Sequence, residues 1–299
     1  MRLTNSMLVQ NVTNNLYNNL ARMNKLNTQL SSGKRINLPS DDPAAVARSL
    51  SLRAAVADTE QFTSNLADAK AWLQATDSAL MGAEDVLRRV KELAVKGSNS
   101  ATLSAEEQQA IADEVDQLID QMVSIANTNH EGRFVFAGYQ TLQEPFSRTG
   151  DTIASHGDDG AIEYRIGPQQ ILAANLDGRE VFGADETTPD RIFKVLIEIK
   201  QHLENGDGGQ VSGSLEELSS SLDNLLQYHS EIGAKMNRVE LAGSHMSQLK
   251  VNYQQLQSEN EDADMAEVIM DLKTSELVYR ASLGAGARVI MPTLMDFLS

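Results

Sequence analysis

A leucine repeat in the first third of the chain constrains its fold more than any other feature. Between Ala44 and Lys96 the sequence has no proline and a single glycine, Gly82. Two apolar rows of period seven run through this stretch: Leu66, Leu73, Leu80, Leu87 and Ala94, and three positions later Ala69, Thr76, Ala83 and Val90. This a/d pattern predicts one continuous helix, on the order of 80 Å long at about 1.5 Å per residue, packed along a seam.

A second seam with the same period lies nearer the C-terminus. Its main row is Leu218, Leu225, Ile232, Val239, Met246 and Tyr253, and Leu215, Leu222 and Met236 form the accompanying row. His229, Gly243 and Lys250 interrupt that accompanying row. Two long seams of this kind predict an elongated antiparallel bundle of long helices, because each apolar stripe needs a partner. The simplest use of the stripes is a helical core and not a cofactor site.

Two shorter helices are expected between the seams. Ser104 and Glu107 form a capping-box pattern before a stripe of Ile111, Val115, Leu118, Met122 and Ile125. The second helix is expected to begin at Thr188-Pro189-Asp190, with proline at the first helical position. Its stripe is Ile192, Leu196, Ile199 and Leu203.

The pattern changes over residues 132–187, where glycine recurs and apolar residues alternate with polar ones. The alternating runs contain Phe134 and Phe136, and then Ile162, Tyr164 and Ile166. They predict a small β-rich insertion, in which Asp159-Gly160 would be the turn of a hairpin. The glycine-rich residues 205–209 are expected to form a flexible link back to helix.

Composition excludes several classes of protein. The chain has 299 residues, a net charge of −17 and no cysteine. The charge opposes phosphate binding and therefore a nucleic-acid partner, and the absence of cysteine excludes disulfides and thiolate metal sites. No apolar run approaches the roughly 18 residues of a spanning helix, so no membrane partner is expected. The N-terminus lacks the apolar segment of a signal peptide.

Catalytic motifs are also missing from the sequence. His130-Glu131 is followed by Gly132-Arg133 and so is no HExxH zinc motif, and the glycines at 284–289 follow a helical pattern and not a strand. The five histidines, at positions 130, 156, 202, 229 and 245, have no partner at ligand spacing. We therefore expect no enzyme activity, no cofactor and no metal site.

The two ends of the chain have opposite charge. Residues 1–40 contain five basic and no acidic side chains, whereas residues 260–299 contain seven acidic and three basic ones. Each end also has an apolar stripe. We expect these residues to form an assembly interface between the two ends and with neighbouring subunits: Leu16, Leu20, Met23, Leu30, Met265, Leu272, Tyr279 and Leu283. The alternative is two ordinary terminal helices docked on one core.

The segment LSSGKRINLPSDDPAAVA, residues 30–47, joins the first end to the long helix. Gly33 is expected to end one helix, and Pro39 disfavours helical geometry at the residue before it. Asp41 or Asp42 would cap a new helix whose first residue is Pro43. These five residues are therefore predicted to form a hinge.

The segment at residues 30–47 resembles the N-terminal signature of the flagellin family of bacterial axial proteins. Its Leu-Ser-Ser-Gly turn, its basic-hydrophobic-Asn run and its Asp-Asp before a small-residue helix match that signature. Pro39, Pro43 and the sequence EGRFVFAGYQTLQEPF at 131–146 resemble the branch found where hook and filament meet. Residues 262–299 are similar to the terminal helix of the family, including its small-residue stretch.

The resemblance implies a mainly α, flagellin-like fold with a β-rich insertion. Residues 1–41 and 260–299 would form the inner tube and be disordered in the free monomer. Residues 42–140 and 188–259 would form the long-helix domain, and residues 141–187 the outward β-rich insertion.

The resemblance also implies a structural adaptor between hook-associated protein 1 at the hook tip and the flagellin filament. Its subunits would form a ring in the extracellular flagellum. They would arrive by type III export, with a flagellar export chaperone and without a cleaved signal peptide.

Three other functions stay open at this point. A short flagellin that forms the filament itself is the nearest, although the chain's shortness, the two prolines at 39 and 43 and the sequence GRFVFAGYQ argue against it. A cytoplasmic coiled-coil regulator would explain the seams but not two unpaired ends of opposite charge. An enzyme would need an unrecognised site in the insertion.

Overall fold

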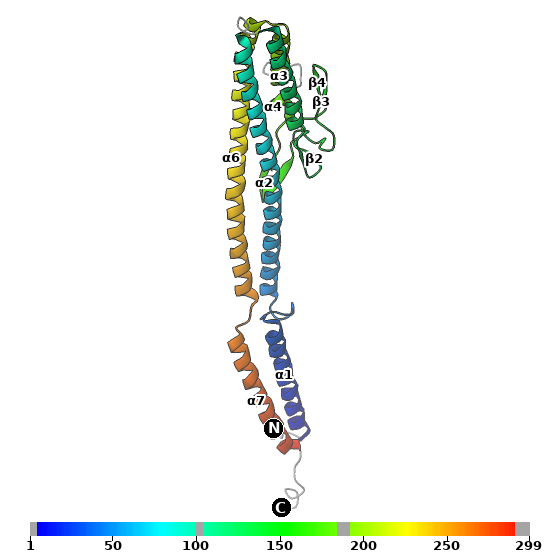
Figure 1. Cartoon of the computed structure of the whole chain (residues 1–299). Helices are drawn as coiled ribbons and strands as arrows, with labels where there is room; N and C mark the ends of the chain where they lie inside the picture. The colour runs from blue at the N-terminus through cyan, green and yellow to red at the C-terminus, as the bar shows by residue number, and fades with distance from the viewer. Residues whose placement is uncertain (1–4, 100–103, 184–191, 291–299) are drawn as a thin grey trace, which may run out of the picture. The chain divides into compact units, whose positions relative to one another are not determined.

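The computed structural model describes residues 5–99, 104–183 and 192–290 (Figure 1). Contacts divide the chain into two units, Met1–Asp58 with Leu249–Ser299, and Thr59–Gln248. We call them the terminal unit and the central unit. Most described residues are helical and the strands are few and short, which confirms the predicted mainly α class with a β-rich insertion.

The elements follow one another in this order. The helices are α1 (Asn5–Ser32), α2 (Pro43–Ser98), α3 (Ala105–Ala126), α4 (Gly178–Phe182), α5 (Ile192–Glu204), α6 (Gly208–Glu261) and α7 (Met265–Ile290). The strands, all between α3 and α4, are β1 (Asn129–His130), β2 (Arg133–Phe134), β3 (Phe146–Thr149), β4 (Thr152–Ser155), β5 (Glu163–Gly167) and β6 (Gln170–Ala173).

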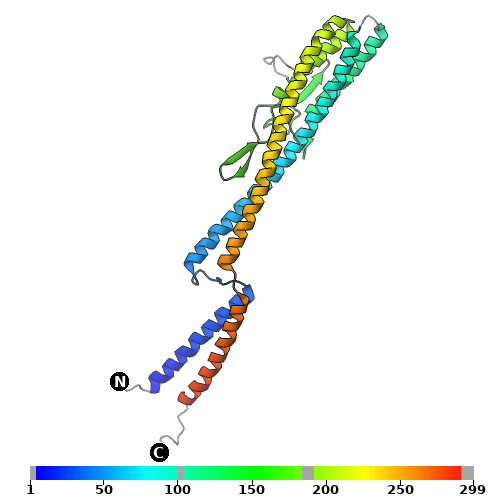
Figure 2. The same cartoon turned by 90° about the vertical axis from the view of Figure 1, so that its left-hand side faces the viewer.

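Both predicted seams are present in the central unit. Every member of the two α2 rows is buried there, and so are Leu218, Leu225, Ile232, Val239 and Met246 of α6. The two helices lie side by side in both views (Figures 1 and 2). Lys91 of α2 donates from Nζ to Ser219 Oγ of α6 at 3.0 Å, and His229 lies 3.0 Å from Asp77. Both α2 rows and the main α6 row up to Met246 are therefore confirmed, whereas Tyr253 and the accompanying α6 row of Leu215, Leu222 and Met236 are only half-buried.

Helix α2 buries a third row that the heptad reading did not include. Its members are Trp72, Ala79, Val86 and Leu93. A side chain at Gly97 would overlap Leu203 of α5, and one at Gly82 would touch Ile125 of α3 at 3.4 Å. The row is buried because α2 packs against α3 and α5 as well as α6, and a helix with several partners needs a wider apolar face.

Helix α3 begins as the sequence predicts. Glu107 N donates to Ser104 Oγ at 3.2 Å, and Ser104 N donates to Glu107 Oε2 at 2.9 Å, so the capping box is complete. The buried stripe is Ile111, Val115, Ile119, Met122 and Ala126. This stripe differs slightly from the predicted one, because Ile119 and Ala126 are buried whereas Leu118 and Ile125 are only half-buried.

Removing this cap gives a first testable prediction. We expect Ser104→Ala to lower the free energy of unfolding by about 1 kcal/mol, because Glu107 N loses its acceptor at the helix start. Urea unfolding followed by circular dichroism measures the change. Ser124→Ala, an exposed serine within the same helix, is the control and should change stability by less than about 0.5 kcal/mol. Equal effects of the two substitutions would contradict the prediction.

The insertion contains three separate antiparallel pairs, β1 with β2, β3 with β4 and β5 with β6. The expected hairpin turn at Asp159-Gly160 is wrong, because strands β4 and β5 on either side of it do not pair with each other. Asp158 Oδ1 instead accepts hydrogen bonds from Gly160 N at 3.0 Å and Tyr139 N at 2.6 Å. The acidic-glycine cluster thus holds the loop at 137–139 in place.

A cluster of phenylalanines packs the insertion against the helices. Phe136, Phe146, Phe182 and Phe193 are buried, and their ring centroids lie 5.1 to 5.9 Å apart in the contacting pairs. Phe193 belongs to α5, so the cluster joins the strand region to a helix of the core. Four of the seven phenylalanines of the chain are therefore used at one place.

Helix α5 buries the predicted stripe of Ile192, Leu196, Ile199 and Leu203. Its expected start at Thr188-Pro189-Asp190 lies outside the described residues. The link to α6 is shorter than predicted, because α6 begins at Gly208, within the glycine-rich segment. Asp207 Oδ1 accepts from Gln210 N at 3.3 Å and starts that helix.

Candidate assembly site

The terminal unit contains an antiparallel pair of helices, α1 and α7 (Figure 2). Asn19 donates from Nδ2 to Ser282 Oγ at 3.3 Å across the pair. One turn further along α7, a side chain at Gly286 would come within 2.9 Å of Val12 Cγ1. Small and polar residues at these positions let the two backbones approach closely.

The buried row of each helix has a seven-residue period. On α1 the row contains Asn19 and Leu26, and on α7 it contains Val268, Ser275 and Ser282, of which Leu26, Val268 and Ser275 are buried. The apolar pattern of the sequence does not reveal these rows, because three of their five members are Asn or Ser. The signal that reveals them is the period itself, read without regard to polarity.

The eight residues predicted as an assembly interface flank this contact. Leu16, Met23, Leu30, Leu272 and Tyr279 are half-buried. Leu20, Met265 and Leu283 are exposed. Since none of the eight is fully buried in the described chain, each has apolar surface left for a further partner, and their role in assembly stays a prediction.

Further apolar side chains of the pair are open to solvent. They are Met7, Leu8 and Tyr17 on α1, and Ile269, Met270, Leu277 and Val278 on α7. Met270 and Leu277, one heptad apart, are 63% and 67% exposed. Exposed apolar residues gathered on one element, unlike scattered ones, mark interaction surfaces.

The joint between α1 and α2 has the local geometry that the sequence predicts. Helix α1 ends at Ser32 and Gly33 follows with a φ of +71°, a left-handed conformation that favours glycine. Helix α2 begins at Pro43, and Asp42 Oδ1 accepts from Ala45 N at 3.0 Å. Asp42 is therefore the cap of α2.

Asp41 has a different task from Asp42. Its Oδ2 accepts from the backbone of Asn37 at 3.2 Å and of Leu38 at 3.0 Å, and its Oδ1 lies 3.0 Å from Lys25 Nζ. The Lys25 bond, with the backbone bonds, holds the pKa of Asp41 below its ordinary value. The carboxylate thus fastens the loop around Pro39 to helix α1.

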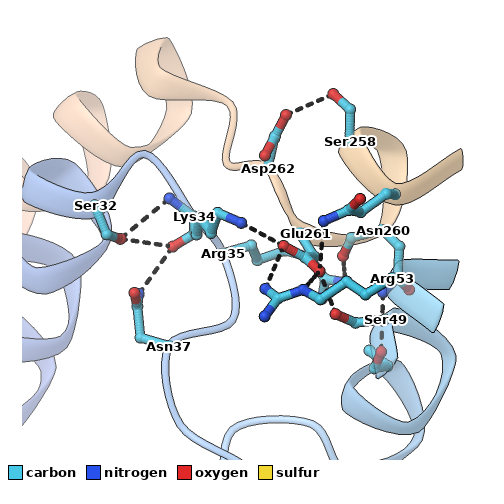
Figure 3. A network of polar contacts seen from close by, with 12 residues as sticks. Ser32, Lys34, Arg35, Asn37, Ser49, Arg53, Ser258, Asn260, Glu261 and Asp262 are labelled. Carbon is cyan, nitrogen blue, oxygen red and sulfur yellow. Dashed lines mark hydrogen bonds and ion pairs between the residues drawn. The ribbon is translucent and has the colours of Figure 1, made fainter. Parts of the chain in front are cut away.

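A buried carboxylate, Glu261, lies at the end of α6 and collects the polar contacts of the joint (Figure 3). Arg53 donates from Nε to Oε1 at 2.9 Å and from Nη2 to Oε2 at 2.8 Å. Lys34 Nζ pairs with Oε2, and Ser49 Oγ donates to Oε1. One side chain therefore connects α6, α2 and the segment that follows α1.

The backbone of the same segments is also paired. Arg35 N donates to Glu261 O at 2.7 Å and Ala263 N donates to Gly33 O at 3.0 Å, so the two connecting segments cross as a short antiparallel bridge. Asn260 Nδ2 donates to Ala45 O at 2.9 Å. Side-chain and backbone contacts thus fix the same crossing point.

The contacts change the ionisation of Glu261. Hydrogen bonds from Arg53, then from Lys34 and Ser49, hold its pKa well below its ordinary value of 4.5, although burial alone would raise it. The carboxylate is ionised at neutral pH. The five predicted hinge residues lie in the connecting segment between α1 and the first residue of α2, and their function as a hinge stays a prediction.

Comparison with known proteins bears on these features. Residues 3–141 match the bacterial flagellin N-terminal helical region. These residues belong to the flagellin family. The matched region begins with α1, passes through the joint and α2, and ends just after β2. The family resemblance inferred from residues 30–47 is confirmed.

Flagellin-family relatives extend the match over nearly the whole chain. Flagellar hook-associated protein 3 of Salmonella typhimurium is 24% identical, over 94% of this chain and 95% of that protein. Flagellin of Bacillus subtilis is 25% identical over 94% of each. The crystal structure of FlgL from Bacillus cereus, 26% identical, superposes with a TM-score of 0.60 over 70% of this chain and 99% of that one.

The chain is thus similar to structural proteins of the bacterial flagellum and not to enzymes. Within the described residues no group of three His, Asp or Glu side chains could hold a metal ion. No described helix is long and apolar enough to cross a membrane. His229 and His156 contact Asp77 and Ser147, as expected of structural histidines.

Proposed function

We propose that the chain is the structural adaptor that joins hook-associated protein 1 at the hook tip to the flagellin filament. The observation that carries this proposal is the match to a relative named flagellar hook-associated protein 3 over 94% of this chain and 95% of that protein. The two prolines of the joint and the sequence at 131–146 support the junction role over that of filament subunit.

Assembly would use the α1–α7 pair. The apolar residues that this pair leaves exposed support packing against the same helices of neighbouring subunits in a ring, as an inner tube. Burial of each large side chain would contribute about 1.5 to 3 kcal/mol before the cost of ordering. Residues 42–140 and 188–259 would form the next layer, and residues 141–187 would face outward.

The same proposal includes the route to the outside. The chain would pass through the flagellar type III export channel without a cleaved signal peptide, held by an export chaperone beforehand. Residues 1–41 and 260–299 would be unfolded in the channel, and those of them that form α1, the joint and α7 in the structure would fold after export. Their opposite charges support pairing of the two ends after export.

Immunogold electron microscopy of intact flagella tests the proposal. The antibody should recognise residues 147–187, within the part of the chain that has its own small strands. We expect one narrow band of label where hook meets filament. Label along the whole filament would instead support the second candidate, a short flagellin, which the match to the Bacillus subtilis protein favours. The absence of flagellar label would reject both.

A further inference from the structure

An exposed apolar ridge lies in the terminal unit, outside the α1–α7 pair. Leu38 of the joint and Leu50 of α2 are each 61% exposed. Both line one small hollow of about 150 Å³, so the two side chains lie together. Ala47, Ala54 and Ala57 are exposed on the same side of α2 as Leu50, because successive residues turn by about 100° around a helix. We call these five residues the ridge.

The end of the ridge at Leu38 is held in place through its backbone. Asp41 Oδ2 accepts from Leu38 N at 3.0 Å and from Asn37 N at 3.2 Å, and Asp41 pairs with Lys25 of α1. Pro39 restricts the backbone directly after Leu38. An exposed side chain on a fixed backbone loses less conformational entropy when a partner covers it. Leu38 is thus preorganised for a contact.

A groove of about 420 Å³ lies on the other side of α2, where this helix meets α6. Its lining residues are Arg48, Ser51, Leu52, Leu256, Glu259 and Asn260. Leu256 is 49% exposed, and most of the surface of the groove is apolar. Arg48 and Leu52 each lie about 160° around the helix from Leu50. The ridge and the groove therefore face different sides of the same folded unit.

The charge of the chain indicates which kind of partner fits these surfaces. The terminal unit, residues 1–58 and 249–299, contains eleven basic and eleven acidic side chains. The central unit, residues 59–248, contains 14 basic and 31 acidic ones, and so it has the whole net charge of −17. Two copies of the central unit repel each other, whereas two copies of the neutral terminal unit do not. A basic partner would be attracted to the central unit instead.

We propose that the ridge of one subunit packs into the groove of a second copy of the chain. Because the two surfaces face different sides of one unit, the contact is heterologous, and each subunit has one neighbour at its ridge and another at its groove. Heterologous contacts close into rings or extend into helical arrays. The inference rests on the proposed ring of subunits and adds to it a contact made by the joint, α2 and α6.

Cysteine cross-linking in purified flagella tests this contact, because the chain has no cysteine of its own. Cells that lack the protein would express two variants together, Leu50→Cys and Leu256→Cys. A bismaleimide with a short spacer should give a cross-linked dimer from the pair and none from either variant alone, since a heterologous contact brings unlike residues together. Gln254→Cys in place of Leu256→Cys is the matched control. Gln254 is exposed on α6 about 160° around the helix from Leu256, so no dimer is expected.

The monomer band of the same gel reports whether the variants are incorporated into the flagellum. Monomer without dimer in the mixed cells, or dimer from Leu50→Cys alone, would overturn the contact and leave the proposed function intact. Absence of even the unchanged chain from the flagella would reject the proposed function and the contact with it. Leu38→Cys, on the same ridge, keeps the test decisive if Leu50→Cys is not incorporated.

A photo-reactive phenylalanine analogue at Leu50 identifies the occupant of the ridge without a second variant. We expect it to label the α6 segment that contains Leu256 in another copy of the chain, as read by mass spectrometry of the cross-linked peptides. Labelling of a different protein in its place would overturn the proposal and assign the ridge to that partner.

Discussion

Replacing Glu261 with glutamine should lower the free energy of unfolding of the terminal unit by about 2 to 3 kcal/mol. The amide keeps the shape of the side chain but loses the charge that Arg53 and Lys34 share. The loss stays below that for a fully buried ion pair, because the side chains of Arg53 and Lys34 are 52% and 39% exposed whereas that of Glu261 is 3% exposed. Both cations can therefore return to water in the variant.

Hydrogen exchange measured by mass spectrometry locates this effect. Amides of the segment around Gly33 and of the last turn of α6 should exchange about 30- to 150-fold faster in Glu261→Gln. Glu259→Gln, at an exposed position of the same helix, is the matched control. Equal protection in the variant and the unchanged chain would show that the network does not hold the joint.

The pH dependence follows from the same contacts. Since the pKa of Glu261 is lowered in the folded chain, its ionised form contributes stability above the ordinary value of 4.5, and this contribution is lost as pH falls below it. The stability difference between the unchanged chain and Glu261→Gln should therefore shrink from pH 7 to pH 3. If this stability difference grew on acidification, the stabilising role of ionised Glu261 would be contradicted.

An aspartate in place of Leu277 should abolish incorporation into the flagellum while leaving the folded chain intact. The side chain is 67% exposed on α7, so the monomer loses little. In a packed inner tube the same position would bury an unpaired charge, which costs several kcal/mol at each contact and is repeated in every subunit. This prediction rests on the proposed role of the α1–α7 pair.

Complementation of a strain that lacks the protein measures the effect, with export checked by assay of the medium. Leu277→Met keeps an apolar side chain of similar size and should restore filaments. Leu16→Asp and Leu272→Asp should also stop incorporation, but these residues are half-buried, so their effect includes the helix pair itself. Normal filaments in cells carrying Leu277→Asp would show that the exposed apolar residues of α7 are not part of the assembly interface.

The seven-residue repeats and the helix start signals of the sequence predicted much of the helical framework. The rows at Leu66 and Leu218 lie in the core, and the start of α2 at Pro43 and the cap at Ser104 are where local chemistry places them. Such features depend on neighbours within one or two turns. They are therefore readable without knowledge of the rest of the fold.

Features that depend on distant partners were not readable. The row at Trp72 is buried only because α3 and α5 lie beside α2, and Glu261 looks like any other glutamate of an acidic segment until Arg53 and Lys34 lie around it. The prediction of a hairpin turn at Asp159-Gly160 was wrong for the same reason. The conformation of this segment depends on the distant loop at Tyr139, whose backbone N–H donates to Asp158. The contact rows of α1 and α7 were hidden by their polarity.

The crossing point at Glu261 has a mechanical consequence. The segment after α1 is bonded there through Lys34, α2 through Arg53, and α6 ends there, so three segments are held together. Several side-chain and backbone bonds at one crossing resist rotation of one segment against another, whereas a flexible tether without such bonds does not. We therefore expect a twist applied to α1 and α7 to be passed on to the adjoining turns of α2 and α6, which is what a part of a rotating shaft must do.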